Sequence, residues 1–150
     1  MEKTESKTES EVRVAALLSR YLVSLDEQEL DAAWAAGLFT QDAVVAFPIS
    51  RHEGLEGMAA YHSTALSAFA ATMHLGSPAD VEVADGRATL RANLVSTHVH
   101  HTGGQEGSSP PLFTTGTLVH GRARLTPLGW RLSELTFSLV WSNGSPRTGS

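Results

Sequence analysis

The amino-acid sequence predicts a single α+β domain, in which N-terminal helices cover one face of a strongly curved, mainly antiparallel sheet. Hydrophobic residues in the N-terminal half recur at steps of three and four, which is typical of helices packed by one side. From residue 81 onward they alternate with a period of two, which is typical of strands. Helices followed by a run of strands is the order of an α+β domain. Because the strands are long, we expect the sheet to curve into a cone-shaped barrel with an internal cavity.

The first helix is predicted from a stripe of hydrophobic residues that ends beside an acidic one. Thr8 or Ser10 can cap its start, because a side-chain oxygen there accepts a hydrogen bond from a free backbone N–H. Asp26 continues the row of Leu18 and Leu22, so we expect it to border the apolar side. The stripe consists of Val14, Leu17, Leu18, Tyr21, Leu22 and Leu25.

Two further helices and a short strand are predicted before the period changes. The ranges are residues 27–38 for the second helix, 43–47 for the strand and 55–72 for the third helix. The second helix would present Leu30, Trp34 and Leu38 on one side. The third would present Met58, His62, Leu66 and Phe69.

The C-terminal half is predicted to be a meander of four strands. Asp85-Gly86 is a strong signal for a two-residue hairpin turn. A segment rich in glycine, serine and proline, residues 102–111, is predicted to be a loop. The strands are expected over residues 81–84, 87–101, 112–125 and 130–141.

Composition limits what the protein can bind. The 150 residues carry a formal net charge of -5, which provides no basic surface for nucleic acid, and they include no cysteine for disulfides or thiolate metal sites. No apolar run is long enough to span a membrane, and the N-terminus lacks the core of a signal peptide. We therefore expect a cytoplasmic protein without nucleic-acid or membrane partners. Polar stretches at 1–9 and 143–150 are expected to be disordered, which leaves one domain over residues 10–142.

Four sequence segments together carry a family resemblance. They are RYLVSLDEQELDAAWAAGLFTQDAVV, HEGLEG, TMH ahead of VEVADG, and GWRL. Over residues 10–142 the chain resembles the SnoaL-like branch of the nuclear-transport-factor-2-like superfamily. That superfamily includes polyketide cyclases, dehydratases, ketosteroid isomerases and non-catalytic binding proteins, so fold alone does not select the reaction. The resemblance implies a helix-covered curved sheet, a homodimer formed through that sheet, and chemistry without a cofactor.

The dehydratases of this superfamily match the chain at four catalytic positions. They carry a tyrosine and an aspartate on the first helix, a histidine after the third helix, and a histidine or aspartate on the long strand. The residues that correspond are Tyr21, Asp26, His74 and His98. As a hypothesis, Asp26 orients and charges His74, which moves the proton, while Tyr21 and His98 hold the substrate oxygen. The family's cyclases instead use a sheet aspartate near the position of His98.

Each of these candidates also has a structural interpretation. Asp26 could cap the second helix together with Glu29, and Tyr21 could pack in the core with its hydroxyl satisfied. His98 and His100 project from the same face of the long strand, and either could face the cavity.

The rest of the pocket is expected from residues on the apolar sides of the helices and on the strand face that carries His98. A metal site is not expected. The set His98, His100 and Glu106 only weakly resembles a cupin-type ligand set, and three N-terminal helices are foreign to that fold. The expected substrate-binding residues are His100, Trp34, Phe47, Met58, His62 and Leu94.

These observations predict a cofactor-independent lyase, cyclase or isomerase that acts on a small, hydrophobic, oxygenated molecule such as a polyketide or terpenoid. The alternative is a small-molecule binding or resistance protein that uses the same cavity without turnover. A scaffold domain is a third possibility, and it predicts a cavity filled by the protein's own side chains. The homodimer is expected to use Thr114, Gly116, Leu118 and Leu135 or Phe137.

Overall fold

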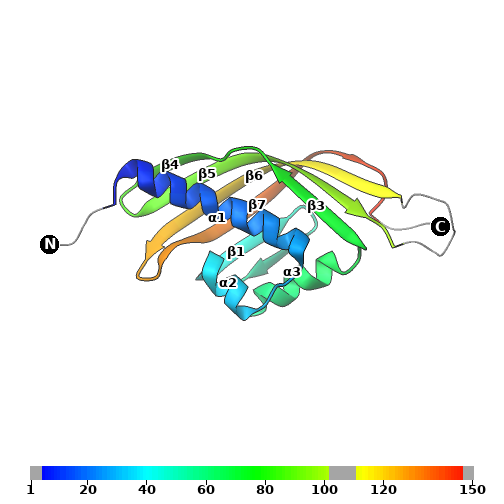
Figure 1. Cartoon of the computed structure of the whole chain (residues 1–150), viewed down its shortest axis with the longest axis horizontal. Coiled ribbons are helices and arrows are strands. Elements are labelled where there is room, and N and C mark those ends of the chain that lie inside the picture. Colours follow the sequence, from blue (N-terminus) through cyan, green and yellow to red (C-terminus); the bar gives the residue numbers. More distant parts are fainter. Residues whose placement is uncertain (1–4, 102–110, 147–150) are drawn as a thin grey trace.

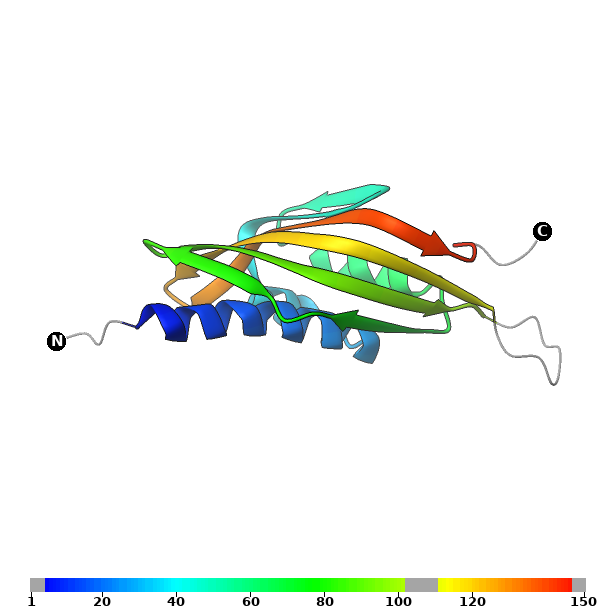
Figure 2. The same cartoon turned by 90° about the horizontal axis from the view of Figure 1, so that it is seen from above.

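The structure is a computed structural model, and it describes residues 5–101 and 111–146. Three helices pack on a curved, open sheet of seven strands (Figure 1, Figure 2). The longest helix, α1 (Lys7–Glu27), crosses one face of the sheet, and α2 (Ala32–Leu38) and α3 (Met58–Leu66) lie near its C-terminal end (Figure 1). The fold class predicted from the sequence is therefore confirmed. No helix in the two described ranges is long and apolar enough to cross a membrane.

Helix α1 begins earlier than predicted because Ser6 caps it. The Ser6 hydroxyl accepts a hydrogen bond from the backbone N–H of Glu9, so neither Thr8 nor Ser10 is the cap. Residues 7–9 consequently belong to the helix and not to the polar tail expected over residues 1–9. All six residues of the predicted hydrophobic stripe are buried.

Helix α2 is shorter than the predicted range of 27–38. Asp31 caps it, with its carboxylate accepting a hydrogen bond from the backbone N–H of Trp34. Gln28 ends α1 in the left-handed conformation, with a φ of 59°. The alternative in which Asp26 and Glu29 cap this helix is therefore wrong.

The third predicted helix divides into a helix and a strand. Helix α3 ends at Leu66, and residues 71–76 form β3 (Ala71–Gly76), which pairs antiparallel with β5 (Arg87–Val99). The backbone groups of this segment form hydrogen bonds with β5. The segment is therefore a strand, although the helical spacing of hydrophobic residues continues to Phe69. His74 therefore lies on a strand, where its neighbours in sequence point to the opposite face.

The remaining strands complete the sheet in the order β2-β1-β7-β6-β5-β3, with β4 on the other stretch of β5. Asp85 and Gly86 form the predicted turn, both with positive φ. Strand β1 runs parallel to β7, and the other pairs are antiparallel. The bounds are β1 (Phe39–Phe47), β2 (Ser50–Glu53), β4 (Asp80–Ala84), β6 (Leu112–Thr126) and β7 (Gly129–Asn143).

The two faces of the sheet differ in what they contact. The inner face packs on the helices, and along β5 it carries the even-numbered residues, which are the buried ones from Ala88 to Ser96. Leu135 and Phe137 are also on this side, with 0% and 5% of their surface exposed. The expectation that either would contribute to a dimer surface is wrong, because both are core residues.

Candidate functional site

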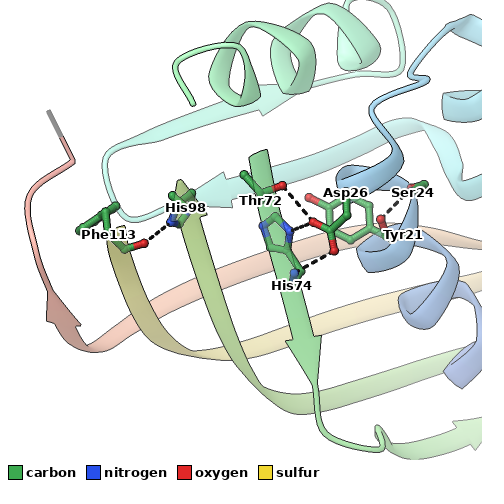
Figure 3. A network of polar contacts seen from close by, with 7 residues as sticks. All are labelled: Tyr21, Ser24, Asp26, Thr72, His74, His98 and Phe113. Carbon is green, nitrogen blue, oxygen red and sulfur yellow. Dashed lines mark hydrogen bonds and ion pairs between the residues drawn. The ribbon is translucent and has the colours of Figure 1, made fainter. Parts of the chain in front are cut away.

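An aspartate and a histidine from distant segments meet beside the inner face of the sheet. The Nδ1 atom of His74 lies 2.7 Å from Oδ1 of Asp26, and the backbone N–H of His74 donates to Oδ2 at 2.9 Å (Figure 3). Thr72 donates its hydroxyl to Oδ1 at 2.9 Å. The carboxylate thus accepts three hydrogen bonds, all from strand β3.

Local structure explains why these groups meet. Asp26 stands in the last turn of α1, one turn after the buried Leu22, so its side chain is directed toward the sheet. Thr72 and His74 are two residues apart on β3 and share the inner face. A carboxylate near a helix C-terminus is electrostatically unfavourable, and the three donors from β3 offset this cost.

The hydrogen bonds determine which nitrogen of His74 carries a proton. A carboxylate can only accept, so Nδ1 of His74 is the donor and Nε2 of the neutral ring keeps a free electron pair. The side chain of His74 is 9% exposed and that of Asp26 is 24% exposed. The pair therefore presents one basic nitrogen in a mostly buried setting, which is the arrangement needed to accept a proton from a bound molecule.

His98 lies next to this pair, on the neighbouring strand β5. Its ring centroid is 6.1 Å from that of His74, and its Nδ1–H donates to the backbone carbonyl of Phe113 (Figure 3). Burial lowers the pKa of His98 below its usual value, although the hydrogen bond to Phe113 opposes the shift. His98 is therefore a neutral imidazole near pH 7, with Nε2 available as an acceptor.

Tyr21 does not reach the Asp26–His74 pair. Its hydroxyl lies 2.8 Å from Nε2 of His62, whose Nδ1–H donates to the backbone carbonyl of Met58. Tyr21 is fully buried, and burial raises its pKa well above the usual value. Burial likewise lowers the pKa of His62 to about 4. The two residues thus form a neutral hydrogen-bonded pair inside the core, which agrees with the structural interpretation of Tyr21.

Most of the expected substrate-binding residues surround this buried pair. Trp34 stacks on Tyr21 with ring centroids 6.2 Å apart, and Phe47 stacks on Phe137 at 4.8 Å. Met58 is fully buried. This part of the cone is therefore packed with the protein's own aromatic side chains.

The other two expected binding residues lie on or beyond β5. Leu94 is buried on the inner face of the strand. His100 is also buried, at the end of β5, and its Nε2 lies 2.6 Å from the backbone carbonyl of Ser145. Of the two histidines left open by the sequence, His98 stands next to His74 and His100 is bonded to the C-terminal segment.

The weak metal interpretation has no support in the described residues. There, no three histidine, cysteine, aspartate or glutamate side chains converge to hold a metal ion. Nδ1 of His98 and Nε2 of His100 already have backbone partners. Glu106, the third proposed ligand, lies outside the described residues.

Thr72 is a site residue that the sequence pattern did not single out. The helical spacing of residues 55–72 places Thr72 at the end of the third predicted helix, whereas the structure places it on β3. The signal that could have found it is the alternation of Thr72, His74 and Gly76 with exposed Met73 and Leu75, which is a strand pattern.

Two grooves lie along β4, β5, β6 and β7, away from this site. They have volumes of about 390 and 680 Å³, and charged residues such as Glu82, Arg122 and Glu134 line both of them. Neither groove includes Asp26 or His74. An internal cavity at the Asp26–His74 pair remains a prediction.

The chain is similar to a family of known sequences and to several known structures. A family model described as a SnoaL-like domain matches residues 6–136. No curated protein sequence matches the chain. One similar structure is a nuclear transport factor 2-like superfamily protein from Salmonella enterica, with a TM-score of 0.74 and 19% identity over 96% of each chain.

Two other similar structures carry names that refer to a reaction. A putative scytalone dehydratase from Novosphingobium aromaticivorans has a TM-score of 0.72 and 16% identity, covering 93% of this chain and 94% of its own. A type 2 hexachlorocyclohexane dehydrochlorinase has a TM-score of 0.73 and 16% identity, covering 89% of this chain and 88% of its own. At these identities the likeness establishes the fold alone.

Proposed function

The chain belongs to the SnoaL-like domain family. We propose that it is a cofactor-independent lyase or isomerase that uses His74 as its base. The observation that supports this most directly is the 2.7 Å contact between His74 Nδ1 and Asp26. The substrate we propose is a small, hydrophobic, oxygenated metabolite of the polyketide or terpenoid type. Elimination reactions appear in the names of two structural neighbours, a dehydratase and a dehydrochlorinase.

The proposed step is proton removal from a carbon next to a carbonyl group. Nε2 of His74 takes the proton, and Asp26 stabilises the imidazolium that forms, as the carboxylate does in hydrolytic triads. The electron pair of the broken C–H bond forms a C=C bond, and a hydroxyl leaves from the adjacent carbon. The imidazolium returns its proton to that hydroxyl, so water is released and His74 is neutral again. A positioned base contributes roughly 10²–10⁴-fold to such a rate.

We assign different roles to the other two catalytic candidates. His98 is a hydrogen-bond acceptor for a substrate hydroxyl, because its Nδ1–H is held by the Phe113 carbonyl and its Nε2 is free to accept. Tyr21 supports the site by packing, since its hydroxyl is bonded to His62 within the core.

The test is a dehydration assay with a small aryl β-hydroxy ketone. Loss of water produces a conjugated enone, which absorbs in the near ultraviolet. The wild type is expected to accelerate this reaction, and His74→Gln is expected to reduce the acceleration at least 10²-fold. His52→Gln is the matched control, because His52 is bonded to the Glu56 carbonyl near α3, away from the pair. Equal rates for wild type and His74→Gln would contradict the proposal, and tight binding of unchanged ketone would favour the non-catalytic binding protein.

We also propose that the protein forms a homodimer through the outer face of the sheet. A row of residues in register crosses four strands there: Leu75, Val95, Gly116 and Trp141. Leu75 is 69% exposed and Trp141 is 45% exposed. Exposed apolar patches of this kind mark association sites. Sedimentation velocity at micromolar concentration tests the proposal, and a monomer would contradict it.

A further inference from the structure

Three hydroxyl residues on β5 and β6 share the inner face of the sheet with His74: Ser96, Thr115 and Thr117. None of their hydroxyls is hydrogen-bonded to another described residue, and the Oγ1 atom of Thr117 is in addition shielded from solvent. Ser96 on β5 stands directly opposite His74 on β3 and directly opposite Thr115 on β6. Thr117 is two residues further along β6, so it shares the same inner face.

Two of these residues, Ser96 and Thr117, are buried, whereas Thr115 is half-buried. The lack of a partner is most informative for Thr117, whose Oγ1 is shielded from solvent. Ser96 is 5% exposed and Thr117 is 9% exposed. Burying a hydroxyl without a hydrogen bond is unfavourable, and most buried polar groups in proteins are paired. The hydroxyl of Thr72, on the same face of the sheet, does have a partner in Asp26. The three hydroxyls without a partner among the described residues thus lie on β5 and β6, next to β3 in the sheet.

The geometry points to a second substrate subsite, in which the hydroxyls of Ser96 and Thr115 bind an oxygen atom of the substrate. The inference rests on the proposed function only for the statement that His74 marks the reacting carbon. Neighbouring strands are about 4.8 Å apart. The substrate oxygen bound at Ser96 therefore lies roughly one strand spacing from the carbon that faces His74. Thr117 extends the polar strip by one more hydroxyl.

This subsite defines a class of substrate. A molecule with a second hydroxyl or carbonyl oxygen, about one strand spacing from the first, can satisfy Ser96 and Thr115. A halogenated hydrocarbon cannot, because it covers both hydroxyls without giving either a hydrogen-bond partner. A site that hydrogen-bonds a ligand oxygen disfavours an analogue that lacks this oxygen, because the polar groups of the site are then left unpaired. The subsite therefore selects dioxygenated ligands over halogenated ones of the same shape.

The test uses two ring compounds that differ in one group, resorcinol and meta-chlorophenol. Binding is followed by nuclear magnetic resonance through the backbone amide shifts of β5. Wild type is expected to bind resorcinol roughly 2- to 10-fold more tightly, which corresponds to one hydrogen bond. Ser96→Ala is expected to remove most of this preference. Thr97→Ala is the matched control, because Thr97 is the next residue on the strand and belongs to the outer face.

A stability measurement separates a binding role from a structural one. Since the Ser96 hydroxyl has no protein partner among the described residues, Ser96→Ala should not lower the midpoint of urea unfolding. A clear fall in that midpoint would identify a structural residue and overturn the inference. Failure of resorcinol to bind wild type at millimolar concentration would also overturn it, as would a preference that survives in Ser96→Ala. Failure of the proposed base would appear differently, as an intact binding preference without turnover in any variant.

Discussion

Replacing Asp26 by asparagine should move the proton on His74 from one ring nitrogen to the other. The carboxylate accepts from Nδ1–H, whereas an amide group facing the same nitrogen donates, so Nδ1 becomes the acceptor and Nε2 the donor. The base is then lost although its ring stays in place. In hydrolases with a carboxylate–imidazole pair, the same exchange lowers kcat by about 10⁴-fold. We expect a loss of about 10³–10⁴-fold here.

The change should also have a measurable but tolerable effect on folding. A hydrogen bond to a charged group contributes about 1.5–3 kcal/mol, and the Asp26 side chain is 24% exposed, so we expect a loss near the lower limit, about 2 kcal/mol in the free energy of unfolding. Asp42→Asn is the matched control, because Asp42 pairs with Arg124 at the surface and away from the site.

The assay for the tautomer is ¹⁵N nuclear magnetic resonance of the His74 ring at neutral pH, alongside urea unfolding. The expected spectra show Nδ1–H in wild type and in Asp42→Asn, and Nε2–H in Asp26→Asn. If the Asp26→Asn ring keeps its proton on Nδ1, or if wild type already carries it on Nε2, the reasoning from the hydrogen bonds is refuted.

Three further predictions concern the core and the outer face. Tyr21→Phe should lower the free energy of unfolding by about 1–3 kcal/mol, because it leaves Nε2 of His62 unpaired in the core. It should change turnover little. Urea unfolding measures the first effect and the dehydration assay the second, and a large loss of turnover at unchanged stability would contradict the packing role. The pKa of His62 is about 4 in the folded chain and about 6.5 in the unfolded chain, so between these pH values the unfolded state binds more protons. The contribution of His62 to the free energy of unfolding should therefore be fully present above pH 6.5 and fall by about 3 kcal/mol as the pH drops to 4. His62→Gln should lose the part of the pH dependence that comes from His62. The control His120→Gln, at an exposed position of β6, should keep it. Identical pH profiles of unfolding for the two variants would contradict the low pKa of His62. Gly116→Ala should displace Trp141, whose indole occupies the space a Cβ would need, and should weaken the proposed dimer roughly tenfold or more by sedimentation; an unchanged dimer would place the interface elsewhere.

The period of hydrophobic residues was enough to predict most of the fold. The stripe of α1, the Asp85-Gly86 turn and the alternation along β5 each depend on local chemistry, and the structure confirms all three. Strand β3 was missed because its alternation covers only six residues and follows directly on a helical repeat. Its identity depends on pairing with β5, which is a long-range contact that local patterns do not contain.

The sequence predicts a site residue correctly when its place in the helix is enough to direct its side chain. It fails when the role of the residue depends on a partner from a distant segment. Asp26 follows Leu22 by one helical turn, and that spacing alone directs it toward the sheet. Tyr21 occupies the same stripe, but its role depends on His62, a partner 41 residues away on another helix. The stripe cannot distinguish a buried pair from a catalytic hydroxyl.

If Nε2 of His74 removes a proton from carbon, the hydrogen atom at that carbon exchanges with the solvent. An aryl β-hydroxy ketone is incubated with the protein in heavy water, and deuterium at the carbon beside the carbonyl is measured by nuclear magnetic resonance. Incorporation of deuterium is expected with wild type, and almost none with His74→Gln or Asp26→Asn. Incorporation at the wild-type rate in His74→Gln would contradict it.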